Sequence, residues 1–516
     1  MISESIINEY LLDRLKIINQ ECYMSAKRFL LIVSILLLQA CGGGGGGGSK
    51  DPVVTSSAPV ATSSAVAISS SSSSSSSSSK SSSSMPADFP VGTAEALPVL
   101  ELKTDNAAPI VSKETYIKGS FSLTDVDGVT AATEGTLEVR GRGNSTWGWS
   151  KKPYRLKLTN STALLGMPKG KNWVLLANYV DKTLMRNDIA FMFSRNLGFE
   201  WTPRSQYVEL KLNGVYQGVY QLVEHIRVDA NRVNIDEMKV GDIDVSTDNG
   251  KGTGGYLMQI DFRHNKDYCV TSSWDTAVCV NGVNTSREID YCLDSTHGMH
   301  PACLENPETL HDPLWVNQRL YIEKYYADFE AALFSPNFAD PTVGYAAYVD
   351  VDSVVNYYLE NELFKNVDGA VASFYLYKKR GGKLFFGPIW DFDLSMGNAG
   401  YDDVDKTNGW HIRSASWFTQ LFKDPAFVAK VKVRWKALKD EGKLEYIFQY
   451  AQARAIWLDK QQKKNFLTWP IADTETDINS WVRHGTHGGT GSYNAEVAEL
   501  IRWQRERVNW IDTQLQ

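Results

Sequence analysis

From Val367 to Asp393 the chain reads VDGAVASFYLYKKRGGKLFFGPIWDFD. The Arg-Gly-Gly segment in the middle of this stretch is typical of a turn. The runs on either side are rich in aromatic and β-branched residues, which favour strands. The stretch therefore predicts a β-hairpin that folds back about Gly381.

This hairpin has acidic residues at its open end. Folding about Gly381 brings Asp368, which precedes the first strand, beside Asp391, which follows the second. Asp393 is two residues further on, so in an extended chain it points to the same side as Asp391. Three carboxylates at one strand end repel one another unless protons or a cation neutralise them. The pattern predicts a divalent-metal site, and the alternative is that the aspartates only cap turns.

A second informative segment lies upstream, between Arg140 and Arg155, and it combines glycines, small hydroxyl residues and cations. Glycines in a loop between strands let backbone N–H groups approach a phosphate, and neighbouring cations neutralise its charge. Arg142 and Asn144 are the candidate phosphate contacts in the loop. Lys151 or Lys152, on the outgoing strand, is a candidate for the α- and β-phosphates. A solvated basic loop without a ligand is the alternative interpretation.

The N-terminal region predicts export. Residues 1–23 precede a better start at Met24, so we interpret them as a misassigned extension. Residues 24–41 contain two cations, a short apolar stretch and a small residue before Cys41, as in a secretory signal peptide. The end of this segment, Leu-Gln-Ala-Cys41, resembles a bacterial lipobox. We expect Cys41 to be lipidated and the protein to be anchored in the membrane, with the outer membrane or cell surface as its location. The alternative is an ordinary signal peptide with an unmodified cysteine.

Residues 42–88 contain a pure glycine run and a long serine run, and they predict a disordered linker because they have little apolar surface to bury. The folded domain is expected over residues 89–516. The formal net charge of the chain is −7. The chain is negative overall and has no stripe of basic residues, so its charge gives no reason to expect a nucleic-acid partner.

The folded domain is predicted to be α+β. Alternating strands are expected at residues 136–140, 154–158, 208–212 and 215–222, with Asn213-Gly214 as a two-residue hairpin turn. Asp181 is expected to cap a helix that ends near Gly198. Helical spacing of apolar residues follows at 314–334, 353–365, 427–438, 444–460 and 495–514. We therefore expect a sheet-rich N-lobe over about residues 89–260, a Cys-rich insertion over about 261–312 and a helical C-lobe over about 313–516.

The insertion holds four cysteines, and in an exported chain an even number of cysteines predicts disulfides. The expected pairs are Cys269 with Cys279 and Cys292 with Cys303. The alternative is a zinc site formed by Cys292, His297, His300 and Cys303.

Several segments of the chain resemble motifs of the CotH (spore-coat protein H) kinase family. They are residues 140–158, 172–187, 219–224, 254–256 and 389–393 with Gly397. They occur in the same order as in the family, across most of residues 98–515.

The resemblance implies an atypical, two-lobed protein-kinase-like fold that uses ATP and Mg²⁺ to phosphorylate protein side chains. By position, it implies that Asp368 orients or deprotonates the acceptor hydroxyl, and that Asp391 holds the metal with help from Asp393. It also implies a phosphate-contacting lysine, for which we choose Lys152, with Glu224 as its ion-pair partner.

One residue departs from the family pattern. Ser373 opens a strand that in the family tends to open with Asn, and a hydroxyl is a poorer ligand for a hard cation than an amide oxygen. The departure puts a second metal site in doubt.

The leading functional hypothesis is an ATP- and Mg²⁺-dependent protein kinase at the cell envelope, acting on Ser or Thr of a protein that the sequence does not identify. ATP is not normally supplied outside the cytoplasmic membrane, so this hypothesis requires a phosphate donor in the compartment to which the protein is exported. The alternative is a non-catalytic, lipid-anchored adhesin or scaffold that binds protein or carbohydrate. Glycoside hydrolysis is disfavoured, because no acid and nucleophile pair is distinct from the assigned aspartates.

Overall fold

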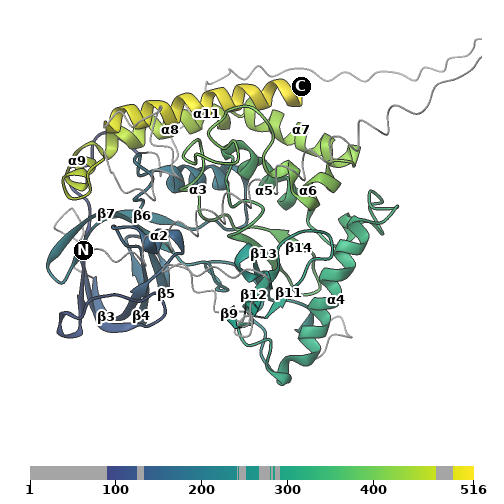
Figure 1. Ribbon diagram of the computed structural model, residues 1–516, viewed down its shortest axis with the longest axis horizontal. Helices are drawn as coiled ribbons and strands as arrows, with labels where there is room; N and C mark the ends of the chain where they lie inside the picture. Colours follow the sequence, from purple (N-terminus) through teal and green to yellow (C-terminus); the bar gives the residue numbers. More distant parts are fainter. Residues whose placement is uncertain are drawn as a thin grey trace, which may run out of the picture. The chain divides into compact units, whose positions relative to one another are not determined.

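In the computed structural model, seven strands of the described chain close into a barrel (Figure 1). The structure describes residues 90–124, 133–240, 242, 251–266, 279–280, 283–284, 291–471 and 492–516. All of them belong to the second of the two units into which the chain divides, Ser83–Gln516. The predicted signal peptide, Cys41 and the predicted linker lie outside the described residues.

The barrel strands are β1 (Val99–Thr104), β2 (Ile117–Thr124), β3 (Thr133–Gly141), β4 (Tyr154–Leu164), β5 (Met167–Leu176), β6 (Ser205–Leu212) and β7 (Val215–Glu224). They pair in the order β1-β2-β3-β4-β5-β7-β6, and β1 completes the ring by pairing in parallel with β6. Alternate residues along the strands, such as Leu100 and Leu102 or Leu156 and Leu158, are buried in one apolar cluster. The apolar residues that alternate along each strand therefore point their side chains into the barrel interior.

The predicted hairpin turn at Asn213-Gly214 is confirmed. These two residues join β6 to β7, and both have positive φ angles, 52° and 81°. Positive φ at both central residues is the type I′ geometry that suits the twist of a hairpin. The Asn213 Oδ1 atom also accepts a hydrogen bond from the Thr104 N–H at 2.9 Å. The turn is thereby tied to the end of β1, next to the place where the barrel closes.

A second sheet contains the hairpin that the sequence analysis began from. Its strands, in spatial order, are β11 (Cys292–Leu293), β12 (Ala302–Asn306), β8 (Tyr256–Ile260), β13 (Phe374–Lys378) and β14 (Leu384–Phe386). β13 and β14 pair antiparallel with Leu376 opposite Phe386, which confirms the predicted fold-back. β11 and β12 come from the segment expected to be an insertion, yet they belong to this sheet. A short separate pair, β9 (Cys279–Val280) and β10 (Val283–Asn284), lies between β8 and β11 in the sequence.

The expected helices are present, with shifted ends. The helices of the described chain are α2 (Ser145–Gly148), α3 (Arg186–Leu197), α4 (Val316–Leu333), α5 (Val351–Phe364), α6 (Ser416–Leu421), α7 (Pro425–Asp440), α8 (Lys443–Trp457), α9 (Asp459–Thr468) and α11 (Tyr493–Leu515). The helix expected at 444–460 is divided at Leu458, which is fully buried in a small cluster with Leu97 and Tyr207. α8 packs against α11, α3 and α7, and α8 and α11 lie side by side in Figure 1. Among the described residues, no helix combines the length and the apolar character needed to cross a bilayer.

Helix α3 ends as predicted, but its N-cap residue is Met185 and not Asp181. The Arg186 N–H, the first of the helix, donates to Asp181 Oδ2 at 2.7 Å, although four residues separate Asp181 from the helix. Gly198 ends α3 with a φ of 78°, the left-handed conformation that glycine adopts without steric cost.

A buried aromatic cluster joins the hairpin to the helices. The Trp417 ring lies 5.9 Å from Phe386 of β14 and 5.0 Å from Phe329 of α4, measured between ring centroids. The Trp417 indole N–H donates to Glu330 Oε1 at 2.8 Å. Trp417 is fully buried, so it connects the packing of α4, α6 and the second sheet.

Replacing Trp417 with alanine should lower the free energy of unfolding by about 3–5 kcal/mol, because it leaves a cavity under the hairpin and removes a partner from Glu330. Urea unfolding measures this loss. Leu467→Ala is the control, since Leu467 is 86% exposed and its truncation should change stability by no more than about 0.5 kcal/mol. Equal losses for the two variants would contradict a structural role for the cluster.

Candidate active site

A cleft of about 410 Å³ lies between the barrel and the second sheet. The barrel contributes Arg140 and Arg155 from β3 and β4, and the loop between these strands contributes Arg142. The opposite wall is acidic, and its residues come from the ends of strands in the second sheet and from the segments that follow them. The cleft is therefore bipolar: its barrel side is mainly cationic, although Glu114 belongs to it, and its other side is mainly acidic, although Arg263 belongs to it.

The acidic wall contains all three aspartates that the sequence singled out. Asp368 lies just before β13, and Asp391 and Asp393 follow β14, so the hairpin brings them to the same cleft. Burial, and to a smaller extent the charge of Asp391, raises the pKa of Asp368 to about 7. Burial and the charges of Asp391 and Asp368 also raise the pKa of Asp393 well above its usual range. The charge of Asp391 thus opposes the ionisation of both Asp368 and Asp393.

The backbone at this wall adopts uncommon conformations. Asp391 has a φ of 68° and Ser373 a φ of 51°, both in the left-handed region that residues other than glycine seldom adopt. Each costs on the order of 1–3 kcal/mol unless the surroundings compensate, and such residues are concentrated at functional sites. The Ser373 hydroxyl donates to Asp391 Oδ2 at 3.2 Å. The residue that departs from the family pattern therefore touches the predicted metal ligand.

The loop that carries Asp391 and Asp393 is held by residues near the start of α3. The Phe392 N–H donates to the side-chain oxygen of Asn187 at 2.8 Å, and Asn187 is buried. The Arg186 Nε–H donates to the carbonyl of Ser395 at 3.1 Å. These contacts fix the backbone between and beyond the two aspartates.

Arg142 and Asn144 of the basic wall each contact a neighbouring side chain. The Arg142 guanidinium lies 5.5 Å from the ring of Trp390, the residue before Asp391. Burial lowers the pKa of Arg142, and the charge of Asp391 opposes this effect. Asn144 Oδ1 accepts a hydrogen bond from Lys113 Nζ at 3.1 Å. Arg142 and Asn144 both line the cleft, where the sequence analysis expected phosphate contacts.

Lys152 and Glu224 are placed differently from the sequence-based expectation. The Lys152 ammonium donates to the carbonyl of Trp147, at 2.8 Å, and Lys152 is not among the residues that line the cleft. Glu224 forms ion pairs with Arg204 at 2.8 Å and Arg232 at 3.9 Å, so the expected pairing with Lys152 is wrong. Sequence spacing could not reveal this, because the positions of Arg204 and Arg232 beside Glu224 depend on the closed barrel.

The other candidate lysine, Lys151, has a structural role. It is buried, and its ammonium donates to the carbonyl oxygens of Ala177 and Val219 and to Asn465 Oδ1, at 2.8, 2.5 and 2.9 Å. Asn465 belongs to α9, so Lys151 joins the barrel to the helical part of the protein.

These positions can be compared with known proteins. The model of the family described as CotH kinase protein matches residues 139–511. The chain belongs to the CotH kinase family. A comparison with curated proteins gives no significant match. The CotH match begins in β3 and ends in α11, so it includes Arg142, the three aspartates and the loop contacts from α3.

Further cleft residues in this CotH kinase domain were not singled out by the sequence analysis. Asp261 and Arg263 follow β8, form an ion pair and line the cleft. Burial alone would lower the pKa of Arg263, but the charge of Asp261 and its hydrogen bond raise it. His225 lines the cleft next to Arg155 and Arg142, and burial together with these charges holds its pKa well below the usual value. The short Asp-x-Arg pattern after a strand was the available signal for the first pair, and nothing local marks His225.

The acidic wall is suited to a hard divalent cation. Two carboxylates and substrate phosphates are a common ligand set for Mg²⁺. The oxygens of Asp368, Asp391 and Asp393 are not a set of three that all lie within 4.8 Å of one another in the described chain. Asp391 and Asp393 are the residues that would hold such a cation, and phosphate oxygens of a bound substrate would supply further ligands.

The cysteine predictions have separate outcomes. The expected Cys292–Cys303 disulfide is confirmed, and the alternative, a zinc site of these two cysteines with His297 and His300, is not formed. His297 instead stacks on Phe334, and His300 pairs with Asn265. The side chains of the other expected pair, Cys269 and Cys279, lie outside the described residues.

Asp393→Asn should raise the midpoint of thermal unfolding of the metal-free protein at pH 8, with a smaller gain at pH 5. The pKa of Asp393 is raised in the folded state, so the wild-type fold loses stability as the pH rises above the unfolded pKa of about 3.9. A neutral amide removes this loss, and its oxygen can still accept from the Leu394 N–H.

Thermal unfolding in the presence of EDTA provides the measurement. Asp352→Asn is the matched control, because the Asp352 side chain is 78% exposed and should show no such pH-dependent gain. Equal midpoints for wild type and Asp393→Asn at pH 8 would exclude a destabilising charge at this position.

Proposed function

We propose that the protein is a phosphotransferase that uses ATP and Mg²⁺ to phosphorylate Ser or Thr side chains of a protein substrate. The bipolar cleft is the observation that carries this proposal. A metal-bound triphosphate is itself bipolar, with an anionic chain that needs cations and a metal that needs carboxylates. The cleft offers both on facing walls, through Arg142 and Arg155 on one side and Asp391 and Asp393 on the other.

The acidic wall would bind the metal and activate the acceptor. Asp391, supported by Ser373 and with Asp393 nearby, would hold the cation. The cation, when bound, would neutralise these carboxylates and stabilise charge on the phosphates. Asp368 would accept the proton of the acceptor hydroxyl, and a carboxyl with a pKa of about 7 is suited to proton transfer near neutral pH.

The basic wall would bind the phosphates of the donor. Arg142 is the best-placed residue, since it lines the cleft and interacts electrostatically with Asp391. Arg155 and Arg140 also line the cleft, and the Nε atom of each is buried without a hydrogen-bond partner in the protein. A guanidinium group can form two parallel hydrogen bonds to the oxygens of one phosphate. These arginines, and not Lys152, would therefore contact the phosphates of the nucleotide.

The proposal extends to the fold and the location. The barrel would correspond to the N-lobe of a protein kinase, and the second sheet with its helices to the C-lobe, because cleft residues come from both. Lipidation at Cys41 and a location at the cell surface or outer membrane remain part of the proposal, on the strength of the sequence before residue 42.

Asp391→Asn should reduce phosphate incorporation by about two orders of magnitude or more, because it removes a charge from the proposed metal ligand. Asparagine tolerates the left-handed backbone that Asp391 adopts, so the fold should persist. The measurement is transfer of labelled phosphate from Mg-ATP to casein or to the protein itself.

Asp352→Asn, a change of the same chemistry at an exposed position, should leave incorporation unchanged. Unaltered incorporation in Asp391→Asn would reject the metal assignment. A wild-type protein that neither transfers phosphate nor gains thermal stability from Mg-ATP, but binds a polysaccharide or a surface protein, would favour the scaffold alternative.

Arg142→Ala should raise the KM for the nucleotide by about tenfold or more, because it removes a charge-assisted contact to phosphate. Lys152→Ala should leave the KM unchanged, since the Lys152 ammonium is directed to the Trp147 carbonyl. Steady-state kinetics at saturating Mg²⁺ separates the two variants. The reverse order of effects would restore Lys152 as the phosphate-contacting residue.

A further inference from the structure

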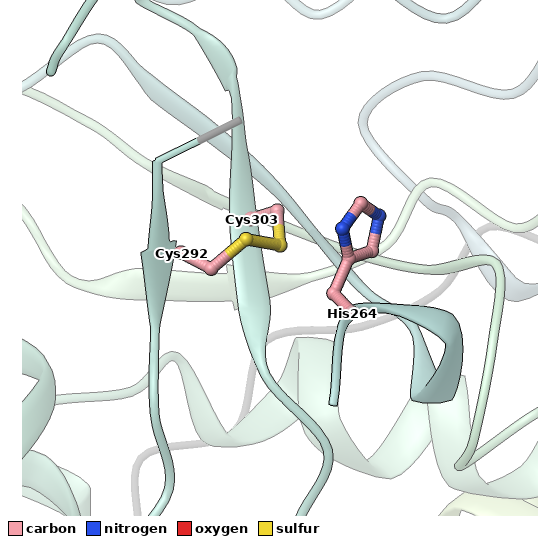
Figure 2. Close-up of side chains that lie close together, drawn as sticks. All are labelled: His264, Cys292 and Cys303. Atoms are coloured by element: carbon pink, nitrogen blue, oxygen red, sulfur yellow. A yellow bond between two sulfur atoms is a disulfide. The ribbon is translucent and has the colours of Figure 1, made fainter. Parts of the chain in front are cut away.

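A second group of chemically active side chains lies beside the cleft. His264, Cys292 and Cys303 have ligand atoms that all lie within 4.8 Å of one another, the one such group of three among the described residues. Figure 2 shows the imidazole of His264 next to the two sulfur atoms. The three residues come from separate elements, namely η3 (Phe262–His264), β11 and β12. The tertiary fold therefore assembles the group.

The chemistry of this group depends on its redox state. In the structure the two sulfurs form the Cys292–Cys303 disulfide, and a disulfide sulfur is not a thiolate ligand. Reduction would produce two thiols beside an imidazole. Two thiolates and one imidazole form a ligand set that suits Zn²⁺, with a fourth position for water or another donor.

The surrounding sheet can keep the ligands in place after reduction. Cys292 and Cys303 are opposite one another in the antiparallel pair of β11 and β12. β12 is also paired with β8, whose last residue, Ile260, lies four positions before His264. Backbone pairing, and not the disulfide alone, thus holds the sulfurs near the ring.

We propose that the reduced protein binds one Zn²⁺ through His264, Cys292 and Cys303, and that the disulfide is the metal-free form of the same site. A dithiol reductant supplies two electrons and two protons. The S–S bond breaks, two thiols form, and the reductant becomes a disulfide. Zn²⁺ then displaces the two thiol protons and bonds to both sulfurs and to one ring nitrogen of His264.

This site is next to the cleft. The turn η3 is capped by Asp261, whose side chain accepts from the Arg263 N–H at 2.9 Å. Asp261, Arg263 and His264 all line the cleft. A metal bound by His264 would therefore fix the turn that carries the Asp261–Arg263 ion pair.

The test uses the full chain with serine at the other four cysteines, Cys22, Cys41, Cys269 and Cys279. The protein is reduced with a phosphine, and the reductant is then removed under anaerobic conditions. The reduced protein is titrated with Co²⁺ and afterwards with Zn²⁺ in competition with a chelator. The expected result is one ion per chain, with the absorption of thiolate-to-cobalt charge transfer, which Zn²⁺ then abolishes. The oxidised protein should give neither the absorption nor the bound ion.

Matched variants define the ligands. His264→Gln should weaken Zn²⁺ binding by at least about tenfold, while mass spectrometry still finds the disulfide in its oxidised form. His300→Gln should bind like the reference protein, because His300 pairs with Asn265 outside the group. Cys292→Ser should lose the cobalt absorption. Failure of the reduced protein to bind, or unchanged binding in His264→Gln, would overturn the proposal, and neither outcome depends on phosphotransferase activity.

Discussion

The ion pair between Arg186 and Asp181 is the interaction on which the candidate active site depends most. Asp181 is fully inaccessible, Arg186 is nearly so, and their charged atoms are 2.5 Å apart. The guanidinium also reaches the carbonyls of Ser395 and Met396, while the carboxylate accepts the first N–H of α3. The loss of one partner from a buried pair costs about 3–5 kcal/mol, so this arrangement strongly resists rearrangement. It holds the loop after Asp393 against α3.

Such support is needed because the cleft gathers groups that oppose one another. Burial and the charge of Asp391 raise the pKa values of Asp368 and Asp393, and Asp391 itself has a strained backbone. Strain and displaced pKa values at one place reduce stability, and proteins usually retain them where they serve binding or catalysis. The Asn187 and Arg186 contacts compensate from one side, and a cation and its phosphates would compensate from the other.

Local patterns in the sequence predicted a good part of this arrangement. The turn chemistry of Arg380-Gly-Gly382 and Asn213-Gly214 is decided by neighbouring residues, so both hairpins could be predicted. The convergence of Asp368 with Asp391 followed from the first hairpin alone. The position of Arg142 in the cleft followed from a loop of known composition between two predicted strands.

What could not be predicted depends on contacts between distant segments. Closure of the barrel requires β1 to pair with β6, more than 100 residues away, and no local pattern marks a parallel partner. The ion pair of Glu224 with Arg204, and the contact of Lys151 with Asn465 of α9, are likewise set by the assembled fold. The choice between Lys151, Lys152 and arginine as the phosphate-facing cation therefore needed the structure.

The most direct test of the central claim is the position of a metal in crystals grown with Mn²⁺ and a non-hydrolysable ATP analogue. Anomalous diffraction should locate Mn²⁺ within bonding distance of Asp391, with the phosphates of the analogue between the metal and Arg142. A metal bound elsewhere, or an analogue that leaves the cleft between Asp391 and Arg142 empty, would contradict the assignment of this cleft to phosphoryl transfer.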